Sequence, residues 1–186
     1  EGIPKELSSM AWAFAKLVID DEPLLQGLSK RLMLKTKECD AQSISNMAWA
    51  FATLLYPAGS LLPALCAEAT RKLDGFDVQE LANFSWALAR LMHFDKTLAE
   101  LLAGRVTHKV TECVMQNLTN TAWAFATLGF RNKALMDCLA AEARKHLRSS
   151  RGIPPQEVTN FSWACAKVGY FDVQFLDDLA EASLRV

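Results

Sequence analysis

The chain has 186 residues, of which 51% are hydrophobic and 22% charged, and its formal net charge is −1. This composition is ordinary for a soluble globular protein of one domain, and the length is enough to bury a continuous core. The near-zero charge excludes attraction of the whole chain to nucleic acid or to an anionic membrane, so a polyanionic partner must be held by a local cluster of Lys and Arg.

Cysteine and histidine are too scattered to form a disulfide frame or a metal site. The five cysteines are odd in number and lie at least 25 residues apart, without a CxxC pair, and the three histidines form no HExxH motif. This usage is typical of a reducing compartment, and we predict no metal and no other cofactor. No nucleophile, base and orienting group recur together and no phosphate-binding loop is present, so we predict that the protein is not an enzyme and has no small-molecule substrate.

Residues 41–67 carry no charge and are long enough to span a bilayer. Pro57, Gly59 and Pro63 interrupt this run, and we therefore expect no insertion into a membrane.

One sequence unit recurs along the chain, and tryptophan marks its period. All five tryptophans belong to this series, and they are separated by 37, 37, 37 and 40 residues: Trp12, Trp49, Trp86, Trp123 and Trp163. Around them the chain reads SSMAWAFAKL, SNMAWAFATL, ANFSWALARL, TNTAWAFATL and TNFSWACAKV. The three extra residues of the last interval fall in the loop-like stretch RSSRGIPPQ. A fixed period of this kind is the signature of a repeat architecture.

In chain order, the predicted units cover about 3–39, 40–76, 77–113, 114–153 and 154–186. Each begins with a helix, here named helix A, that extends about six residues to either side of the tryptophan, over 6–18, 43–55, 80–92, 117–129 and 157–169. In the third unit Asp77 and Glu80 have the spacing of a capping box. Turn residues such as Gly129 and Gly169 follow helix A. A second helix of about four turns, helix B, then carries two apolar columns: Leu24, Leu61, Leu98, Leu135 and Phe175, and Leu28, Leu65, Leu102, Leu139 and Leu179.

Helix pairs of this size cannot bury their apolar faces alone, so each must pack on its neighbours. We therefore predict an all-α fold, an α-solenoid of about five stacked hairpins in a single domain, with helices A on one side and helices B on the other. Both ends have ordinary repeat sequence and residue 1 is Glu rather than Met, so we expect part of a longer array. The alternative is that the acidic last helix is a terminal cap.

Helix A has a predicted core face and two flanks of small residues. Opposite the tryptophan lies an apolar stripe, which in the third unit consists of Leu81, Phe84, Leu88 and Leu91. The flanks would let successive helices A approach closely. Ala13, Ala50, Ala87, Ala124 and Ala164 form one flank, and Ala15, Ala52, Ala89, Ala126 and Ala166 form the other.

The remaining face of helix A is polar, aromatic and partly basic, and we call its side chains the tryptophan face. Seven residues before the tryptophan stand Gln42, Gln79, Gln116 and Gln156, with Lys5 in the first unit. Three before it stand Asn46, Asn83, Asn120 and Asn160, with Ser9 in the first unit. Four after it stand Lys16, Thr53, Arg90, Thr127 and Lys167.

Amides can read base edges, an indole can stack on a base, and Lys or Arg can neutralise phosphate, so this face has the chemistry of single-stranded RNA recognition. The alternative is structural: a repeated Trp packs between repeats, and a repeated Asn bridges them through backbone hydrogen bonds.

A second basic stripe is predicted near the end of helix B, 22 and 23 residues after each tryptophan. It comprises Lys35, Arg71, Lys72, His108, Lys109, Lys145, His146 and Arg185. Such a stripe could bind phosphates, in which case affinity would fall steeply with salt. The alternative is that these cations only stabilise the C-terminal ends of their helices.

The stretch QELANFSWALARL (Gln79 to Leu91) and its counterparts SISNMAWAFATL, NLTNTAWAFATL and EVTNFSWACAKVG resemble the octotricopeptide and heptatricopeptide repeats of organellar proteins that act on RNA. The resemblance covers essentially the whole chain, and the 37-residue period is closer to the heptatricopeptide form. It implies binding of organellar transcripts or ribosomal RNA for maturation, stability or translation, and a location in the mitochondrion or plastid.

Two functions are therefore in competition. The first is a non-catalytic RNA-binding module, in which five repeats at one base each would read about five nucleotides. The second is a protein-interaction scaffold, or a structural subunit of a large organellar assembly, which the neutral charge favours.

Overall fold

The computed structural model describes residues 3–148 and 152–184. Within these ranges the chain is all-α, as predicted, with ten α-helices and no strand. The A helices are α1 (Pro4–Lys16), α3 (Ala41–Leu54), α5 (Val78–Arg90), α7 (Met115–Thr127) and α9 (Pro155–Val168). The B helices are α2 (Glu22–Met33), α4 (Leu61–Lys72), α6 (Lys96–His108), α8 (Lys133–Leu147) and α10 (Val173–Ser183). Three short 3-10 helices lie between units: η1 (Thr36–Glu38), η2 (Leu73–Gly75) and η3 (Val110–Glu112).

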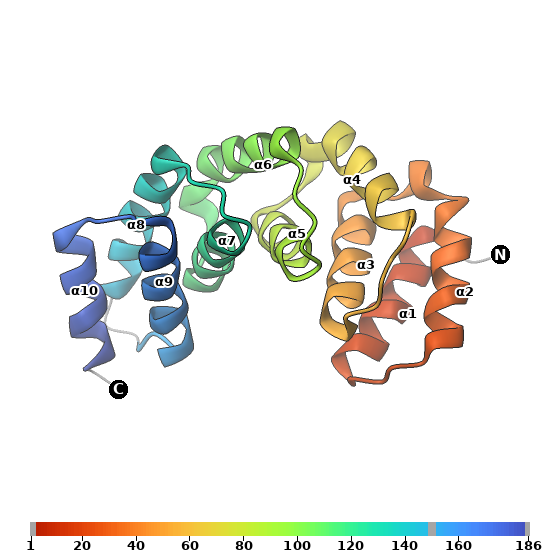
Figure 1. Ribbon diagram of the computed structural model, residues 1–186, viewed down its shortest axis with the longest axis horizontal. Coiled ribbons are helices and arrows are strands. Elements are labelled where there is room, and N and C mark those ends of the chain that lie inside the picture. Colours follow the sequence, from red (N-terminus) through yellow and green to blue (C-terminus); the bar gives the residue numbers. More distant parts are fainter. Residues whose placement is uncertain (1–2, 149–151, 185–186) are drawn as a thin grey trace.

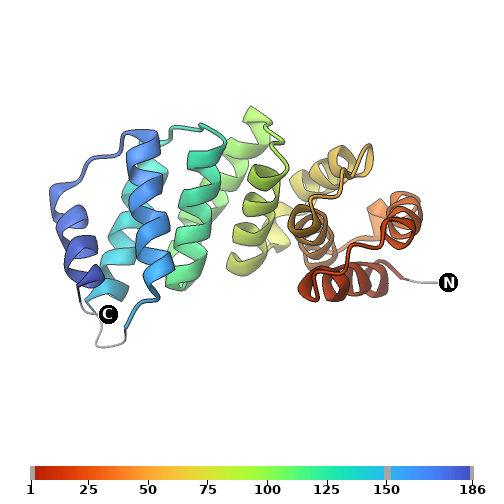
Figure 2. The ribbon, with the colours of Figure 1, turned by 60° about the horizontal axis from the view of Figure 1, so that its bottom comes forward.

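The helices form two layers that follow an arc. Each A helix packs most extensively against the next A helix along the chain. The B helices cover the outer side of this layer, so the A helices line the inner side of the arc, and the two chain ends lie at its opposite ends (Figure 1). Figure 2 shows α5, α7 and α9 side by side. Side chains at equivalent positions of successive A helices therefore lie on the same side of this layer.

The A helices begin two residues earlier than predicted. In α3 and α5 the carboxylates of Asp40 and Asp77 accept hydrogen bonds from the backbone N–H of Ser43 and Glu80. The Glu80 carboxylate in turn accepts a hydrogen bond from the Asp77 N–H at 2.9 Å, which confirms the predicted capping box. Because an N-cap satisfies N–H groups two or three residues downstream, the first helical turn starts next to the aspartate. The B helices are about three turns long in most units, shorter than predicted.

Every A helix ends in the same way. The residue six after each tryptophan has a left-handed backbone: Val18 (φ 55°), Leu55 (54°), Met92 (53°), Gly129 (70°) and Gly169 (70°). The following N–H then donates to the carbonyl five residues earlier, as Phe130 does to Phe125 at 3.0 Å. This closing bond satisfies a carbonyl that the end of the helix leaves free.

The core lies between the two layers. The predicted stripe of α5 is buried at Leu81, Phe84 and Leu88 and half-buried at Leu91. Both apolar columns of the B helices are buried except for Leu24, which is half-buried.

Alanine lines the contacts between neighbouring A helices. Ala50, Ala87, Ala124 and Ala164 are at most 1% exposed, as are Ala15, Ala52, Ala89 and Ala126. Ala13 and Ala166 are exposed because they lie on the outer faces of the first and last A helices. Small side chains thus allow close approach wherever two A helices meet.

Candidate functional site

The five tryptophans form a single file along the A layer. Ring centroids are 6.3 Å apart for Trp12–Trp49, Trp49–Trp86 and Trp123–Trp163 and 6.4 Å apart for Trp86–Trp123, and successive planes are inclined by 30–38°. Aromatic rings in direct contact have centroids about 4.5–7 Å apart, so each indole packs on the next and no base fits between them. We call this file the tryptophan ladder, and its geometry supports a structural role for the rings.

The ladder also defines a surface. It lies on the side of the A helices opposite the buried stripe, and this places it on the inner side of the arc. The three inner tryptophans are half-buried, whereas Trp12 and Trp163 at the ends are 40% and 43% exposed. The indoles thus form a continuous floor with the polar side chains of the tryptophan face beside it.

The asparagine row beside the ladder has amides that no other described residue engages. Asn46, Asn83, Asn120 and Asn160 are half-buried, and none of their side chains hydrogen-bonds to another residue in the described parts of the chain. Their amide atoms also do not appear among the polar atoms that are sealed from solvent. The asparagines therefore do not bridge neighbouring units. Ser9, which takes this place in α1, is exposed.

The glutamine row continues the polar surface toward the start of each A helix. Gln42, Gln79, Gln116 and Gln156 are exposed, and their amides have no hydrogen-bond partner among the described residues. Together the two rows give four units a pair of amides on one helix face, one exposed and one partly recessed. An amide carries both a donor and an acceptor, which is the pairing that a base edge requires.

The row four residues after the tryptophan alternates between cations and threonines. Lys16, Arg90 and Lys167 are exposed, and none forms an ion pair with a carboxylate of the described residues. The Lys16 ammonium lies 5.6 Å from the Trp12 ring and 5.9 Å from the Trp49 ring, over the junction of the two indoles. Thr53 and Thr127 are half-buried, and their hydroxyl oxygens are sealed from solvent without a hydrogen-bond partner within the described residues.

The second basic stripe is engaged in contacts between units. The Lys72 ammonium donates to the Lys37 and Cys39 carbonyls at 2.7 Å, and the Lys109 ammonium donates to the Phe76 carbonyl at 2.9 Å. His146 Nε2 lies 3.0 Å from the Cys113 carbonyl. The three accepting residues Cys39, Phe76 and Cys113 hold the same place, directly after the 3-10 helix of the preceding unit. These bonds join consecutive units, a role that the sequence analysis did not predict.

Other members of the stripe pair with acids on their own helix or turn. Lys35 pairs with Glu38 at 3.3 Å, Arg71 with Glu68 at 3.2 Å and Lys145 with Glu142 at 2.6 Å. His108 is exposed, and Arg185 lies outside the described residues. The stripe therefore differs from the tryptophan face, where Lys16, Arg90 and Lys167 form no ion pair with the carboxylates that the structure describes.

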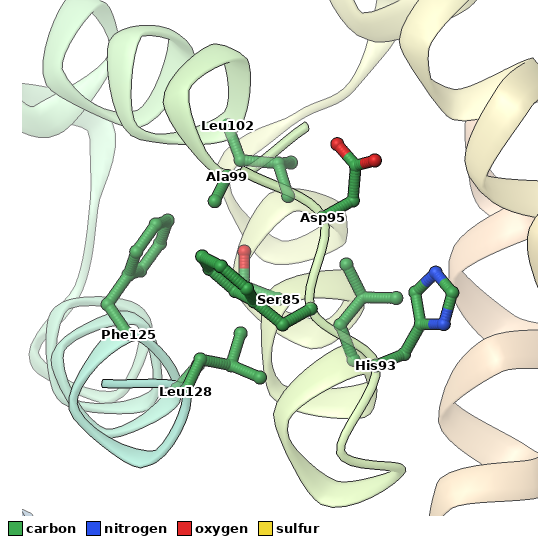
Figure 3. Close-up of a pocket in the computed structure, with 10 residues that line it drawn as sticks. Ser85, His93, Asp95, Ala99, Leu102, Phe125 and Leu128 are labelled. Atoms are coloured by element: carbon green, nitrogen blue, oxygen red, sulfur yellow. The ribbon is translucent and has the colours of Figure 1, made fainter. Parts of the chain in front are cut away.

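The cavity between α5, α6 and α7 is too small for a substrate. Ser85, Phe94 and Phe125 are among the residues that line it (Figure 3), and its volume is about 10 Å³. This space holds roughly one water molecule. The Ser85 hydroxyl is buried without a hydrogen-bond partner among the described residues, so the site suits water and no larger ligand.

A more open hollow of about 350 Å³ lies between the turns of the fourth and fifth units. Arg131, Met136 and Phe171 are among its lining residues. Tyr170 is also in its wall, and burial together with the nearby Asp137 carboxylate raises the pKa of its phenol. At neutral pH the tyrosine is therefore protonated and is no base.

Four buried cysteines, Cys39, Cys66, Cys113 and Cys165, are poor nucleophiles in the folded chain. Burial raises the pKa of the Cys39 and Cys113 thiols to about 11 and that of the Cys66 and Cys165 thiols to about 12. The reactive form of cysteine is the thiolate, which is scarce at neutral pH when the pKa is this high.

The described residues contain neither a metal-binding cluster nor a membrane-spanning helix. No group of three or more His, Cys, Asp or Glu side chains in them is arranged to hold a metal ion. Among the helices in the described ranges, none has the length and apolar character needed to cross a membrane.

Comparison of the chain with protein-family models and with curated proteins gave no match.

Proposed function

We propose that the chain is an α-solenoid of five helical hairpins that binds single-stranded RNA along the tryptophan face. The observation that carries the proposal is the row of four half-buried asparagine amides without hydrogen-bond partners among the described residues. Because these amides reach solvent, water can pair with them in the free protein, and a ligand that displaces this water must offer donors and acceptors in its place. Four such amides in register on one surface are available to an external ligand.

The neighbouring rows favour nucleic acid as that ligand. The exposed glutamines add a second amide in each of four units. Lys16, Arg90 and Lys167 are exposed, have no carboxylate partner within the described ranges and provide positive charge. Sequence-specific RNA recognition uses splayed bases whose edges accept and donate hydrogen bonds, while phosphates contact cations. The cations of the B helices contribute less to this function because most of them pair with acids or carbonyls of the chain itself.

The resemblance to octotricopeptide and heptatricopeptide repeats adds to the proposal the kind of RNA, the compartment and the cellular role. On that basis the RNA is an organellar transcript or a ribosomal RNA, the protein acts in the mitochondrion or plastid, and its role is maturation, stability or translation without catalysis.

The experiment measures binding of a fluorescein-labelled random single-stranded RNA library by fluorescence anisotropy at low salt. We expect binding, and we expect that Asn83→Ser with Asn120→Ser lowers the affinity about tenfold or more, since a base contact by a side-chain amide contributes roughly 1–3 kcal/mol. Serine is chosen because Ser9 occupies this position in α1.

The matched control is Gln26→Ser, which removes an exposed amide from α2 in the outer layer. It should bind RNA as the unchanged protein does. If no single-stranded RNA binds at low salt, the proposed function is wrong.

A protein-interaction scaffold is the second candidate, and the exposed apolar turns favour it. Val18, Leu55 and Met92 follow three successive A helices and are 76%, 58% and 71% exposed. Exposed apolar side chains close together are typical of protein contacts. Substituting Leu55 and Met92 by serine would abolish such a contact and leave RNA binding unchanged.

A further inference from the structure

The charge on the tryptophan face has a period of two units. Four residues after each tryptophan the chain carries Lys16, Thr53, Arg90, Thr127 and Lys167 in order. The amide rows, in contrast, repeat in every unit from the second to the fifth. A ligand on this surface therefore meets an amide pair at nearly every step of the ladder but a cation only at every second step.

The threonines cannot replace the missing cations. The hydroxyl oxygens of Thr53 and Thr127 are sealed from solvent, so a ligand on the surface does not reach them. The cations are exposed, and Lys16 is held against two rings of the ladder at 5.6 and 5.9 Å. The alternation is thus a property of the accessible surface as well as of the sequence.

The step of the ladder sets how a strand can follow it. Consecutive rings are 6.3–6.4 Å apart, whereas stacked nucleotides of one strand rise by about 3.4 Å each. One step thus corresponds to about two stacked nucleotides or to one that is unstacked. Reading of base edges by side chains requires unstacked bases, so the single-nucleotide step fits the amide rows.

We propose that the RNA strand lies along the ladder in an unstacked form and that the protein contacts its phosphates at every second nucleotide, through Lys16, Arg90 and Lys167. This inference rests on the proposed function and adds the number and spacing of the charge contacts. Placing the cations two steps apart also limits their mutual repulsion when the site is empty.

The test exchanges the two residue types that already alternate in this row. One variant carries Lys16→Thr, Arg90→Thr and Lys167→Thr, and the other carries Thr53→Lys and Thr127→Lys. The affinity of a fluorescein-labelled single-stranded RNA is measured at several salt concentrations for each protein. For single strands the slope of log K against log salt is about −0.7 for each phosphate contacted. We expect a slope of about −2 for the unchanged protein, near zero for the first variant and about −3.5 for the second.

A matched control separates local contacts from net charge. Lys30→Thr, Lys96→Thr and Lys133→Thr remove three exposed cations from the B helices. This triple variant should retain the slope of the unchanged protein, and thermal melts should show that every variant folds.

Two results would overturn the inference, and they are distinguishable. If RNA binds and the three threonine substitutions leave the slope unchanged, the phosphates are contacted elsewhere and the proposed function stands. If the control lowers the slope as much as the substitutions on the tryptophan face, net charge alone is responsible. Absence of binding to the unchanged protein contradicts the proposed function itself.

Discussion

In the described part of the chain, left-handed backbone recurs at a fixed position, six residues after each tryptophan. Five A helices end in this conformation, yet only Gly129 and Gly169 are glycines. For a residue with a Cβ atom the left-handed region costs roughly 1–2 kcal/mol. Val18, Leu55 and Met92 bear this cost with their side chains largely exposed, so packing gives little in return.

Met92→Gly should therefore stabilise the protein. The substitution removes the strain at φ 53°, and the side chain that it deletes is 71% exposed. Part of the gain is offset because glycine loses more backbone freedom on folding. We expect the free energy of unfolding to rise by about 0.5–1 kcal/mol, measured by urea denaturation.

Two glycines provide the comparison. Gly129→Ala should destabilise the protein, because Gly129 has a φ of 70°. Gly104→Ala should stabilise it, since Gly104 lies within α6 and an added Cβ meets no atom within 4 Å. The same sign of change at both positions would contradict the assignment of strain to the left-handed turn.

At the scale of the helices, contact between neighbouring A helices depends on alanine. Ala87 is fully buried on the flank of α5, whereas Ala13 holds the same place on the outer face of α1 and is exposed. Ala87→Leu should overpack this contact and lower the free energy of unfolding by about 1–3 kcal/mol. Thermal or urea denaturation provides the measurement.

Ala13→Leu makes the same chemical change where no helix opposes it. We expect a change within about 0.5 kcal/mol. If both variants unfold alike, close packing of the A helices does not control stability.

Much of the helical arrangement could be predicted because one strong signal repeats. The tryptophan period located the A helices, and the Leu81, Phe84 and Leu88 stripe identified the buried face of α5. The A helices begin two residues earlier than predicted, because the predicted ranges were centred on the tryptophan and did not start at N-cap residues such as Asp40 and Asp77.

Contacts between units could not be predicted from one unit. The Lys109 ammonium donates a hydrogen bond to the Phe76 carbonyl of the preceding unit. This bond depends on the distance between two units, which the period of the sequence does not give. Likewise, a repeated asparagine is compatible with bridging or with a free amide, and only the positions of adjacent helices distinguish the two. A signal for the lysine bridge was present, because Lys72, Lys109 and His146 share one register 23 residues after the tryptophan.

At the scale of the whole molecule, the bridges and alanine contacts found in the described ranges connect consecutive units. Stability in such an array is close to a sum of local terms, so units at the ends open more easily than those inside. One cysteine falls in each predicted unit, and Cys39, Cys66, Cys113 and Cys165 are buried.

Thiol labelling should therefore report opening unit by unit. With iodoacetamide at neutral pH, we expect half-buried Cys138 to react first, followed by Cys165 in the last unit, and Cys66 and Cys113 last. The raised pKa of the buried thiols lowers their thiolate fraction at neutral pH and slows their reaction further, and labelling should accelerate steadily as the pH rises toward about 11–12 or as the chain opens. Simultaneous labelling of the buried thiols would indicate a single cooperative transition.

The tryptophan ladder also has an optical consequence. Indoles separated by 6.3–6.4 Å are close enough to exchange excitation energy, so we expect light absorbed by one ring to be emitted by another ring of the ladder. Because successive rings are inclined to one another, this transfer should depolarise the emission of the ladder. A substitution that separates two neighbouring rings should interrupt this transfer. The intrinsic fluorescence of the whole ladder should then change.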